Sequence, residues 1–528
     1  MFHYPLLGST VNITDLPVIG PHFLLTPLAN QEETFRVKNV RNRYYTFRQV
    51  PVSVTNFSLS LKVTIAGLSE ELLLEIFCYY LDTTPRLWPR LAHICRRWRR
   101  VVFVSQRTLR LRLFCTYGTP VVKCLDCWPT LPIVVRYGGS PELDAPTSED
   151  EDNILAALKQ SDRVSSIHLF LTNSLLEKLS AIGRPVSELE DLVLLSQDSR
   201  QTLPNNAFEW GTRLRSLHLT RIAYVALPQL LYSSRKLVDL RLHEVLSPWL
   251  LSPESLTDAL SGMTLLQSLS LHLLPTTDHI GRHLPYGKRI VLPSLTRLNF
   301  RGIAVYLEDL VAGIDAPYLS DIEVTYSNEP VSDFSKLYEF IDRIQTYKSP
   351  RRADILSSEY AITISLIQRG APTSLKFQLL CESLALQISL IARTCGHFSA
   401  FIFDVEDLRI SATPRQSRPA DGLHSEAWLE PLNSFTGVKW LHISGELYEY
   451  IVRSLEGAER PKTVFPAMHK LYIPQPGSRD APLSEAVVSL MTSRRLSGHP
   501  FAVEYERQYH TGITYAKHYH PYSLTHLE

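Results

Sequence analysis

Two cysteines are the first residues whose types and spacing could do chemistry. Cys124 and Cys127 have half the spacing of a zinc knuckle, or the spacing of a redox pair. A structural zinc site needs two more ligands nearby, and only Cys115 and the distant His93 offer themselves. We therefore interpret both cysteines as small apolar side chains that pack beside Trp128, and we predict no metal site.

The sequence contains look-alikes of enzyme motifs but no complete one. The segment from Gly281 imitates a phosphate-binding loop, yet five residues separate it from Gly287, and Arg289 stands where Ser or Thr should hold Mg²⁺. His243 lacks the second His of a zinc-protease helix, and no G-x-S-x-G elbow occurs. We interpret a group of histidines as part of a polar, aromatic tail: His510, His518, His520 and His526. We predict no catalytic residue, no cofactor and no enzyme activity.

A basic run surrounds Trp98 in "ICRRWRRVV" and could bind nucleic acid, direct the chain to the nucleus, or border a docking helix. The basic side chains are Arg96, Arg97, Arg99 and Arg100. The spacing of Trp98 to Ile94, Val101 and Val102 predicts that the ring lies on the buried side of a helix. The 54 Lys and Arg are balanced by 53 Asp and Glu, which argues against a polyanion partner.

Composition and length describe a large protein with no membrane segment. With 528 residues, the chain predicts two or more domains or one elongated repeat domain. Seven irregularly spaced cysteines indicate a reducing compartment, and the first ten residues lack a secretory signal. The apolar window from Leu384 is interrupted by Arg393, Gly396 and His397 and is too polar to span a bilayer. We expect a cytoplasmic or nuclear location, or both.

A repeated six-residue pattern with apolar residues at positions 1, 4 and 6 occupies most of the chain after residue 150. Six copies begin at Leu189, Leu214, Leu237, Leu266, Leu295 and Leu319. Weaker copies begin at Val164, Phe398, Val438 and Met468. The starts from Val164 to Leu319 are 23 to 29 residues apart, which is close to the period of leucine-rich repeats. The register lapses between Leu319 and Phe398, where the segment from Ser374 is a candidate for one more strand.

The pattern predicts an α/β solenoid in which each strand is followed by a returning helix. Candidate helices follow Leu251, with Ser252 or Ser255 as the cap, and Ala304, and a third precedes Phe398. Ser148 and Glu151 have the spacing of a capping box for another helix. Parallel strands stacked in this way expose the residues between the apolar positions as one broad surface, which in repeat proteins binds other proteins.

The segment of residues 65–103 predicts two or three short helices before the repeats. Ser69 can cap a helix whose first turn carries Glu70 and Glu71. Two neighbouring apolar faces follow, one with Leu72, Ile76 and Tyr80 and the other with Leu73, Phe77 and Leu81. This much apolar surface in about forty residues predicts a module that a partner completes.

Two segments resemble the F-box family: "LSEELLLEIFCYYL" and "LAHICRRWRRVV". The degenerate repeats that follow them resemble those of the fungal F-box proteins. The resemblance covers residues 65 to 140, and Ser69 replaces the Pro that usually opens the motif. It implies a set of adaptor-binding residues: Leu68, Leu72, Leu73, Ile76, Phe77, Leu81, Ile94, Cys95 and Trp98.

The resemblance implies a short all-α F-box module followed by a leucine-rich-repeat-like α/β solenoid. The predicted divisions are an N-terminal extension that we expect to be poorly ordered (1–64), the F-box (65–112), a connecting segment with a short strand in "LPIVVRY" and an acidic linker (113–153), the solenoid (154–510) and a C-terminal tail (511–528). The implied function is that of a substrate receptor in a ubiquitin ligase, with a Skp-type adaptor and through it a cullin as partners, and an unknown protein as substrate. A scaffold that acts without a cullin and a nucleic-acid-binding protein stay open as alternatives.

Overall fold

The computed structural model describes most of the chain in eighteen stretches. These are residues 34–38, 44–48, 67–128, 130–137, 146–180, 185–197, 201–203, 209–210, 213–244, 251–274, 289–327, 334–347, 350–368, 374–381, 383–413, 425–457, 464–474 and 483–506. The chain divides into two units, Met1–Leu73 and Leu74–Glu528. Within the predicted N-terminal extension, β1 (Thr34–Lys38) pairs antiparallel with β2 (Tyr44–Arg48). The boundary between the units falls inside one helix, α1 (Glu70–Thr83).

Short helices form the segment before the sheet, as the spacing of apolar residues predicted. They are α1 (Glu70–Thr83), a 3₁₀ turn (Pro85–Leu87), α2 (Trp88–Ile94) and α3 (Arg96–Val104). The predicted second helical stretch is thus two helices, because the backbone at Cys95 is extended.

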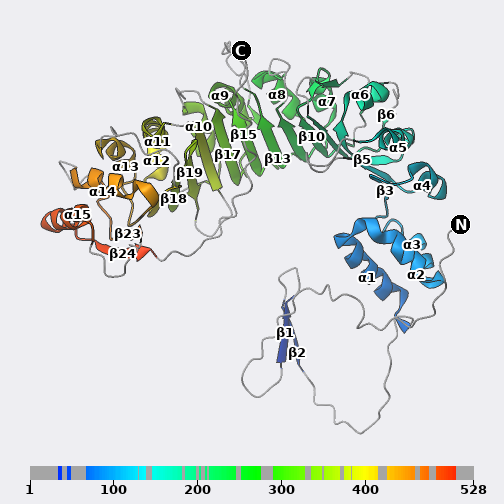
Figure 1. Ribbon diagram of the computed structural model, residues 1–528, viewed down its shortest axis with the longest axis horizontal. Helices are drawn as coiled ribbons and strands as arrows, with labels where there is room; N and C mark the ends of the chain where they lie inside the picture. The colour runs from blue at the N-terminus through cyan, green and yellow to red at the C-terminus, as the bar shows by residue number, and fades with distance from the viewer. Residues whose placement is uncertain are drawn as a thin grey trace, which may run out of the picture. The chain divides into compact units, whose positions relative to one another are not determined.

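One large, mostly parallel sheet dominates the second unit (Figure 1). Within the described residues it has 16 strands. In their order across the sheet, these are β3 (Leu113–Cys115), β4 (Ile133–Tyr137), β5 (Val164–Leu171), β7 (Asp191–Ser196), β10 (Ser216–Thr220), β12 (Asp239–His243), β13 (Ser268–His272), β15 (Arg297–Gly302), β17 (Asp321–Ser327), β20 (Ser374–Leu380), β19 (Ala361–Ile367), β18 (Arg352–Ser357), β21 (Asp407–Ala412), β22 (Trp440–Ser444), β23 (Lys470–Pro474) and β24 (Ala502–Glu506).

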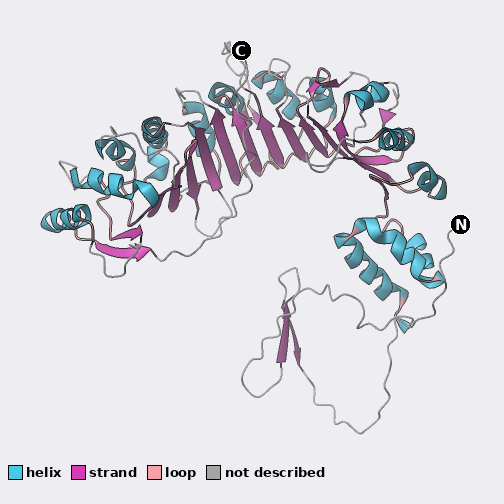
Figure 2. Cartoon of the chain, viewed as in Figure 1, coloured by secondary structure: helices cyan, strands magenta, loops and turns pink. Residues whose placement is uncertain are grey.

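Helices follow the strands and line up along one face of the sheet, as Figure 2 shows. They are α4 (Val121–Cys127), α5 (Ser148–Leu158), α6 (Asn173–Ser180), α7 (Leu227–Ser233), α8 (Pro253–Leu260), α9 (Ala304–Ala312), α10 (Ser335–Asp342), α11 (Leu384–His397), α12 (Ser399–Ile402), α13 (Leu429–Leu432), α14 (Tyr448–Gly457) and α15 (Glu485–Leu496). Short parallel pairs accompany the sheet: β6 (Pro185–Val186) with β9 (Glu209–Trp210), β8 (Thr202–Leu203) with β11 (Ala223–Tyr224), and β14 (Ile290–Val291) with β16 (Ile314–Asp315). The fold is therefore mixed α/β, as predicted.

The alternation of burial along each strand explains why the repeated leucines predict this sheet. In β12, Leu240 and Leu242 are buried while Arg241 between them is only partly covered. Successive side chains of a strand point to opposite faces, so the leucines face the helices and the intervening residues face solvent. The strands predicted from the six strong copies and from Val164, Val438 and Met468 are all present.

The copy predicted at Phe398 is wrong. Phe398 follows α11 as its C-terminal cap, and its ring packs against Phe377, with 5.0 Å between the ring centroids. The strand lies later, as β21, and the segment from Val405 has the same spacing, with buried Val405, Leu408 and Ile410. Phe398, Phe401 and Phe403 satisfied the same six-residue pattern by chance, although Phe401 lies in α12 and Phe403 is exposed, so the pattern alone could not separate the two segments.

An inserted antiparallel meander explains why the repeat register lapses after Leu319. β20 lies beside β17 in parallel, as the segment from Ser374 predicted, but β19 pairs antiparallel with both β20 and β18. The parallel order resumes where β18 pairs with β21. After β17 the chain first forms β18, the strand of the meander that lies farthest from β17. The three strands therefore appear in the sheet in the reverse of their order along the chain.

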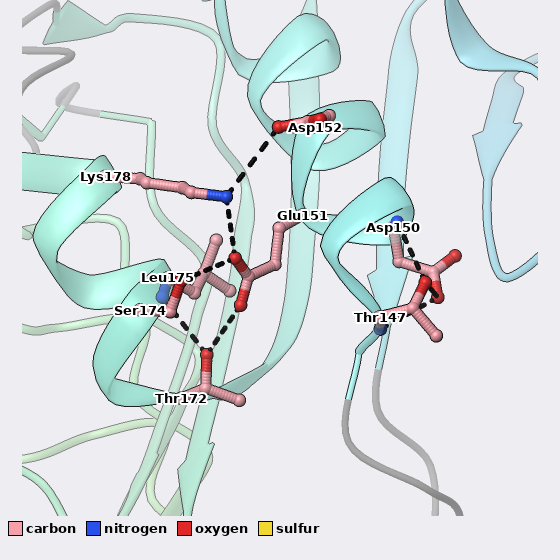
Figure 3. A network of polar contacts seen from close by, with 8 residues as sticks. All are labelled: Thr147, Asp150, Glu151, Asp152, Thr172, Ser174, Leu175 and Lys178. Carbon is pink, nitrogen blue, oxygen red and sulfur yellow. Dashed lines mark hydrogen bonds and ion pairs between the residues drawn. The ribbon is translucent and has the colours of Figure 1, made fainter.

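Helix α5 is fastened to α6 by a buried carboxylate (Figure 3). The predicted capping box at Ser148 and Glu151 is shifted by one residue, because Thr147 and Asp150 form it. Glu151 instead accepts hydrogen bonds from the side chains of its neighbours on α6 and just before it: Thr172 Oγ1 at 2.9 Å, Ser174 Oγ at 2.8 Å and Lys178 Nζ at 2.8 Å. The side chain therefore joins two successive helices of the layer.

Several sequence predictions fall outside the described residues. The histidines of the C-terminal tail and residues 281–288 of the loop that resembles a phosphate-binding loop are among them. The apolar window from Leu384 forms α11 and the short helix after it. Among the described residues, no helix combines the length and the apolar character that crossing a membrane requires.

Candidate functional site

The start of α1 is built by Ser69, as the sequence predicted. The Leu72 amide donates a hydrogen bond to Ser69 Oγ at 3.3 Å, which satisfies one of the free amides of the first turn. Backbone amide donation and the Ser69 hydroxyl hold the pKa of Glu71 below its ordinary value. Ser therefore starts this helix in the place where the F-box pattern has Pro.

The predicted adaptor-binding residues of α1 divide into an inner and an outer face. Leu73, Phe77 and Leu81 are buried, at intervals of four residues. Leu72 and Ile76, one position earlier on the helix, are each 49% exposed. The inner residues therefore form core and leave the outer pair to contact another molecule. Leu68, before the helix, is partly buried.

Cys95 breaks the second helical stretch and places Ile94 on the surface. The Trp98 amide donates to Cys95 Sγ at 3.4 Å, so the thiol caps α3. Cys95 itself is exposed, and Ile94 is 58% exposed. The expected position of Ile94 on a buried face with Trp98 is therefore wrong, because the break at Cys95 changes the helical phase. Both residues remain candidates for a contact surface.

Trp98 links α3 to α1 through Phe77. The two ring centroids are 4.7 Å apart and the ring planes are tilted by 60°. Trp98 is partly buried, while Val101 and Val102 on the same helix are fully covered. Aromatic pairs in this geometry contribute about 0.5–1.5 kcal/mol beyond the area that they bury. Trp98 therefore supports the position of the helix and also presents part of its ring to solvent.

The basic run lies mostly on the exposed side of α3. Arg96, Arg99 and Arg100 are exposed, and Arg97 is partly buried. Arg99 Nε donates a hydrogen bond to the Ala92 carbonyl in the last turn of α2, at 2.9 Å. A cationic side chain at this point satisfies a free carbonyl and interacts favourably with the helix dipole. At least one arginine of the run thus has a structural task that the sequence did not indicate.

An aromatic anchor that the sequence analysis missed joins the helices to the first strand of the sheet. Trp88 is buried, and its Nε1 donates to the Arg112 carbonyl at 2.8 Å. Its ring lies edge-on to Trp128, with 5.0 Å between centroids, and Phe103 stacks on Trp128 at 5.2 Å. The signal for this cluster in the sequence was the presence of three large aromatic residues, which lie far apart in the segment.

Of the cysteines near Trp128, Cys115 is buried, Cys124 is partly buried and Cys127 is exposed. Burial raises the pKa of the Cys115 thiol to about 12, and burial also raises that of Cys124, so both stay protonated at neutral pH. Cys124 and Cys127 lie on one short helix, α4. Within the described ranges, no three side chains of His, Cys, Asp or Glu are placed so that they could hold a metal ion together.

Comparison with protein-family models and with curated proteins finds no match for this sequence.

Proposed function

We propose that this chain is a substrate receptor of a cullin-type ubiquitin ligase, and that α1 to α3 form an F-box that binds a Skp-type adaptor. The observation that carries the proposal is the division of the F-box-like residues into a buried set and an exposed apolar set. Leu72, Ile76 and Ile94 are each about half exposed, whereas Leu73, Phe77 and Leu81 on α1 and Leu91 on α2 are buried. Fully covering one such side chain would contribute about 1–1.5 kcal/mol, half of its full burial value.

The sheet supports the second half of the proposal, which is that a degenerate leucine-rich-repeat solenoid holds a protein substrate. Consecutive strands are parallel and in register, with one helix layer behind them. The helix-free face is open along the strands and carries polar side chains. In repeat proteins such a face is the usual place for a protein partner. A receptor of this kind supplies proximity and orientation, so the chain needs no catalytic residue of its own.

Co-purification from the source cell tests the proposal. We expect the tagged full-length chain to retain a Skp-type adaptor and a cullin, both identified by mass spectrometry, and the Leu72→Asp variant to lose both. Leu496→Asp is the matched control, because Leu496 on α15 is 85% exposed and undergoes the same substitution. If both variants retain the adaptor as well as the wild type does, the assignment of α1 is wrong.

The alternative is a scaffold that engages the adaptor without a cullin. Ser69 in place of the usual Pro is the sequence feature that keeps it open. Recovery of the adaptor without any cullin, in a preparation that preserves other cullin complexes, would favour the scaffold over the ligase receptor.

A further inference from the structure

The helix-free face of the sheet carries histidines on several of the strands from β5 to β15. In the paired register, His168 lies in one row with Val193, His218, Arg241, Ser270 and Asn299. Two positions further along the strands, the next row contains Phe170, Leu195, Thr220, His243, His272 and Arg301. Arg136 on β4 continues the first row next to His168. We define the basic strip as Arg136, His168, His218, His243, His272 and Arg301.

The histidines of the strip contact one another and their strand neighbours. The rings of His243 and His272 stack with 4.0 Å between centroids, and His218 meets His243 edge-on at 5.0 Å. His243 Nε2 forms a hydrogen bond with Ser270 Oγ at 2.9 Å, and His218 Nε2 with Thr220 Oγ1 at 3.0 Å. Their contacts hold these rings in fixed orientations on the open face, so the strip is a preformed surface.

Within β5 to β15 these two rows contain no carboxylate, and Glu323 on β17 continues the first row beside Asn299. On the solvent-facing positions of β5 to β15 the acidic residues are Asp191 and Asp239, both in the row at the start of the strands. Asp239 forms an ion pair with Arg241 at 2.9 Å. Arg136 and Arg301 are exposed and form no ion pair within the described stretches. The strip therefore carries an exposed arginine at each end and imidazoles between them.

We propose that the basic strip binds an acidic, extended peptide segment of the protein substrate. This proposal rests on the receptor function proposed above in one respect only, which is that the bound protein is called a substrate. Strands about 4.8 Å apart place β15 roughly 29 Å from β4, a distance that an extended peptide of about 9 residues covers. Arg301 and Arg136 hold the carboxylates near the ends, and the histidines receive those between.

Binding of such a peptide takes up protons. Burial, with His272, His218 and Arg241 nearby, lowers the pKa of His243 to about 3, and burial, with Arg136 and His218, lowers that of His168 to about 4. Burial also lowers the pKa of His218 and of His272. The other charged groups that act on these two rings are Asp239 and Arg241 at His218, and Arg301, Glu244 and Glu323 at His272. The rings are neutral at pH 7, and added carboxylates raise their pKa values, so affinity increases as the pH falls.

Fluorescence anisotropy with the full-length chain tests the proposal. The probe is a labelled peptide of about 8 residues with Glu at every second position, and its counterpart has Gln at those positions. We expect the Glu peptide to bind at least about tenfold more tightly than the Gln peptide, and to bind more tightly at about pH 5.5 than at about pH 7.5. A single-stranded RNA of similar length is the third probe.

Two pairs of substitutions locate the site. His243→Gln with Arg301→Gln should weaken binding of the Glu peptide at least about fivefold. The second variant, Arg136→Gln with Arg301→Gln, changes only exposed side chains. It replaces the first variant in the binding assay if the first variant unfolds at a lower temperature than the wild type. The matched control is Arg409→Gln with His442→Gln, on the same face of β21 and β22 but outside the strip.

Equal affinity for the two peptides, or no loss in either strip variant, overturns the proposal. Tighter binding of the RNA than of the Glu peptide also overturns it and assigns the strip to nucleic acid. The assay contains no adaptor and no cullin, so its outcome is independent of the test of α1. If the chain does not bind the adaptor but does bind the Glu peptide, the receptor function is refuted and the basic strip is still assigned as a peptide-binding site.

Discussion

At the scale of single residues, the basic run around Trp98 contributes to the helical segment mainly through its apolar residues and through one arginine, Arg99. Trp98 packs on Phe77, and Arg99 donates to the Ala92 carbonyl. Both are contacts inside the helical segment, which leaves Ile94 and Cys95 as the exposed residues at the break between α2 and α3. The exposed arginines Arg96 and Arg100 lie on the same helix beside this break.

Replacing Arg99 separates its structural role from its charge. Arg99→Ala removes the donor to the Ala92 carbonyl, and we expect the free energy of unfolding to fall by about 0.5–1.5 kcal/mol, the net value of one such hydrogen bond. Urea unfolding followed by circular dichroism measures the change. Arg96→Ala, an exposed arginine on the same helix, is the control and should alter stability by less than about 0.5 kcal/mol. Equal effects of the two substitutions would contradict the role of Arg99.

At the scale of elements, the helices are held to one another by polar contacts that local sequence does not reveal. The capping box of α5 is formed by Thr147 and Asp150, and this frees Glu151 to accept three side-chain hydrogen bonds from the segment of α6. The sequence indicated the start of the helix to within one residue. It could not indicate the partners of Glu151, because they lie more than twenty residues later.

Glu151 gives a prediction for the pH dependence of stability. Burial alone would raise its pKa, but hydrogen bonds from Lys178, Ser174 and Thr172 outweigh burial and lower it. The carboxylate thus stabilises the fold above the unfolded-state pKa of about 4.3, and the contribution is lost as the pH falls through the lower folded-state pKa. We expect Glu151→Gln to cost about 1.5–3 kcal/mol at pH 7, and this difference from the wild type to shrink at acidic pH. A difference that stays constant with pH would show that the charge of Glu151 does not matter.

Two glycines provide a matched pair of substitutions, because one lies in a turn after a strand and the other lies in a helix. Gly445 follows β22 with a φ of +75°, and a Cβ there would lie 2.4 Å from the Ala412 carbonyl oxygen. Gly396 lies in α11, and a Cβ there would meet nothing within 4 Å. We expect Gly445→Ala to destabilise the protein by at least about 1 kcal/mol and Gly396→Ala to stabilise it by about 0.5–1 kcal/mol. Thermal unfolding measures both, and the same sign for both would contradict this account of the turn.

At the scale of the whole molecule, the repeated leucines predicted most of the parallel strands. The prediction succeeds wherever a strand alternates between the helix layer and solvent, as β12 does with Leu240 and Leu242. It fails at Phe398, where the cap of α11 and the short helix α12 have the same apolar spacing, and it stops at the meander of β18 to β20. Antiparallel strands joined by short turns need no returning helix, so the repeat period has no meaning there.

The candidate adaptor site was predictable only in part. Spacing placed Leu72 and Leu73 on adjoining apolar faces but could not say which face is buried, because that depends on the helices packed around α1. The structure buries Leu73 and exposes Leu72. The basic strip on the open face was not predicted, because His243 and His272 are neighbours only through strand pairing.

The most direct test of the central claim is the affinity of the purified chain for a Skp-type adaptor, measured by calorimetry with three proteins. The account predicts that the wild type and Leu496→Asp bind equally well. Leu72→Asp should bind at least about tenfold more weakly, a loss of about 1.4 kcal/mol, with an unchanged unfolding temperature. Absence of adaptor binding by the wild type, or equal binding by all three proteins, would contradict the account.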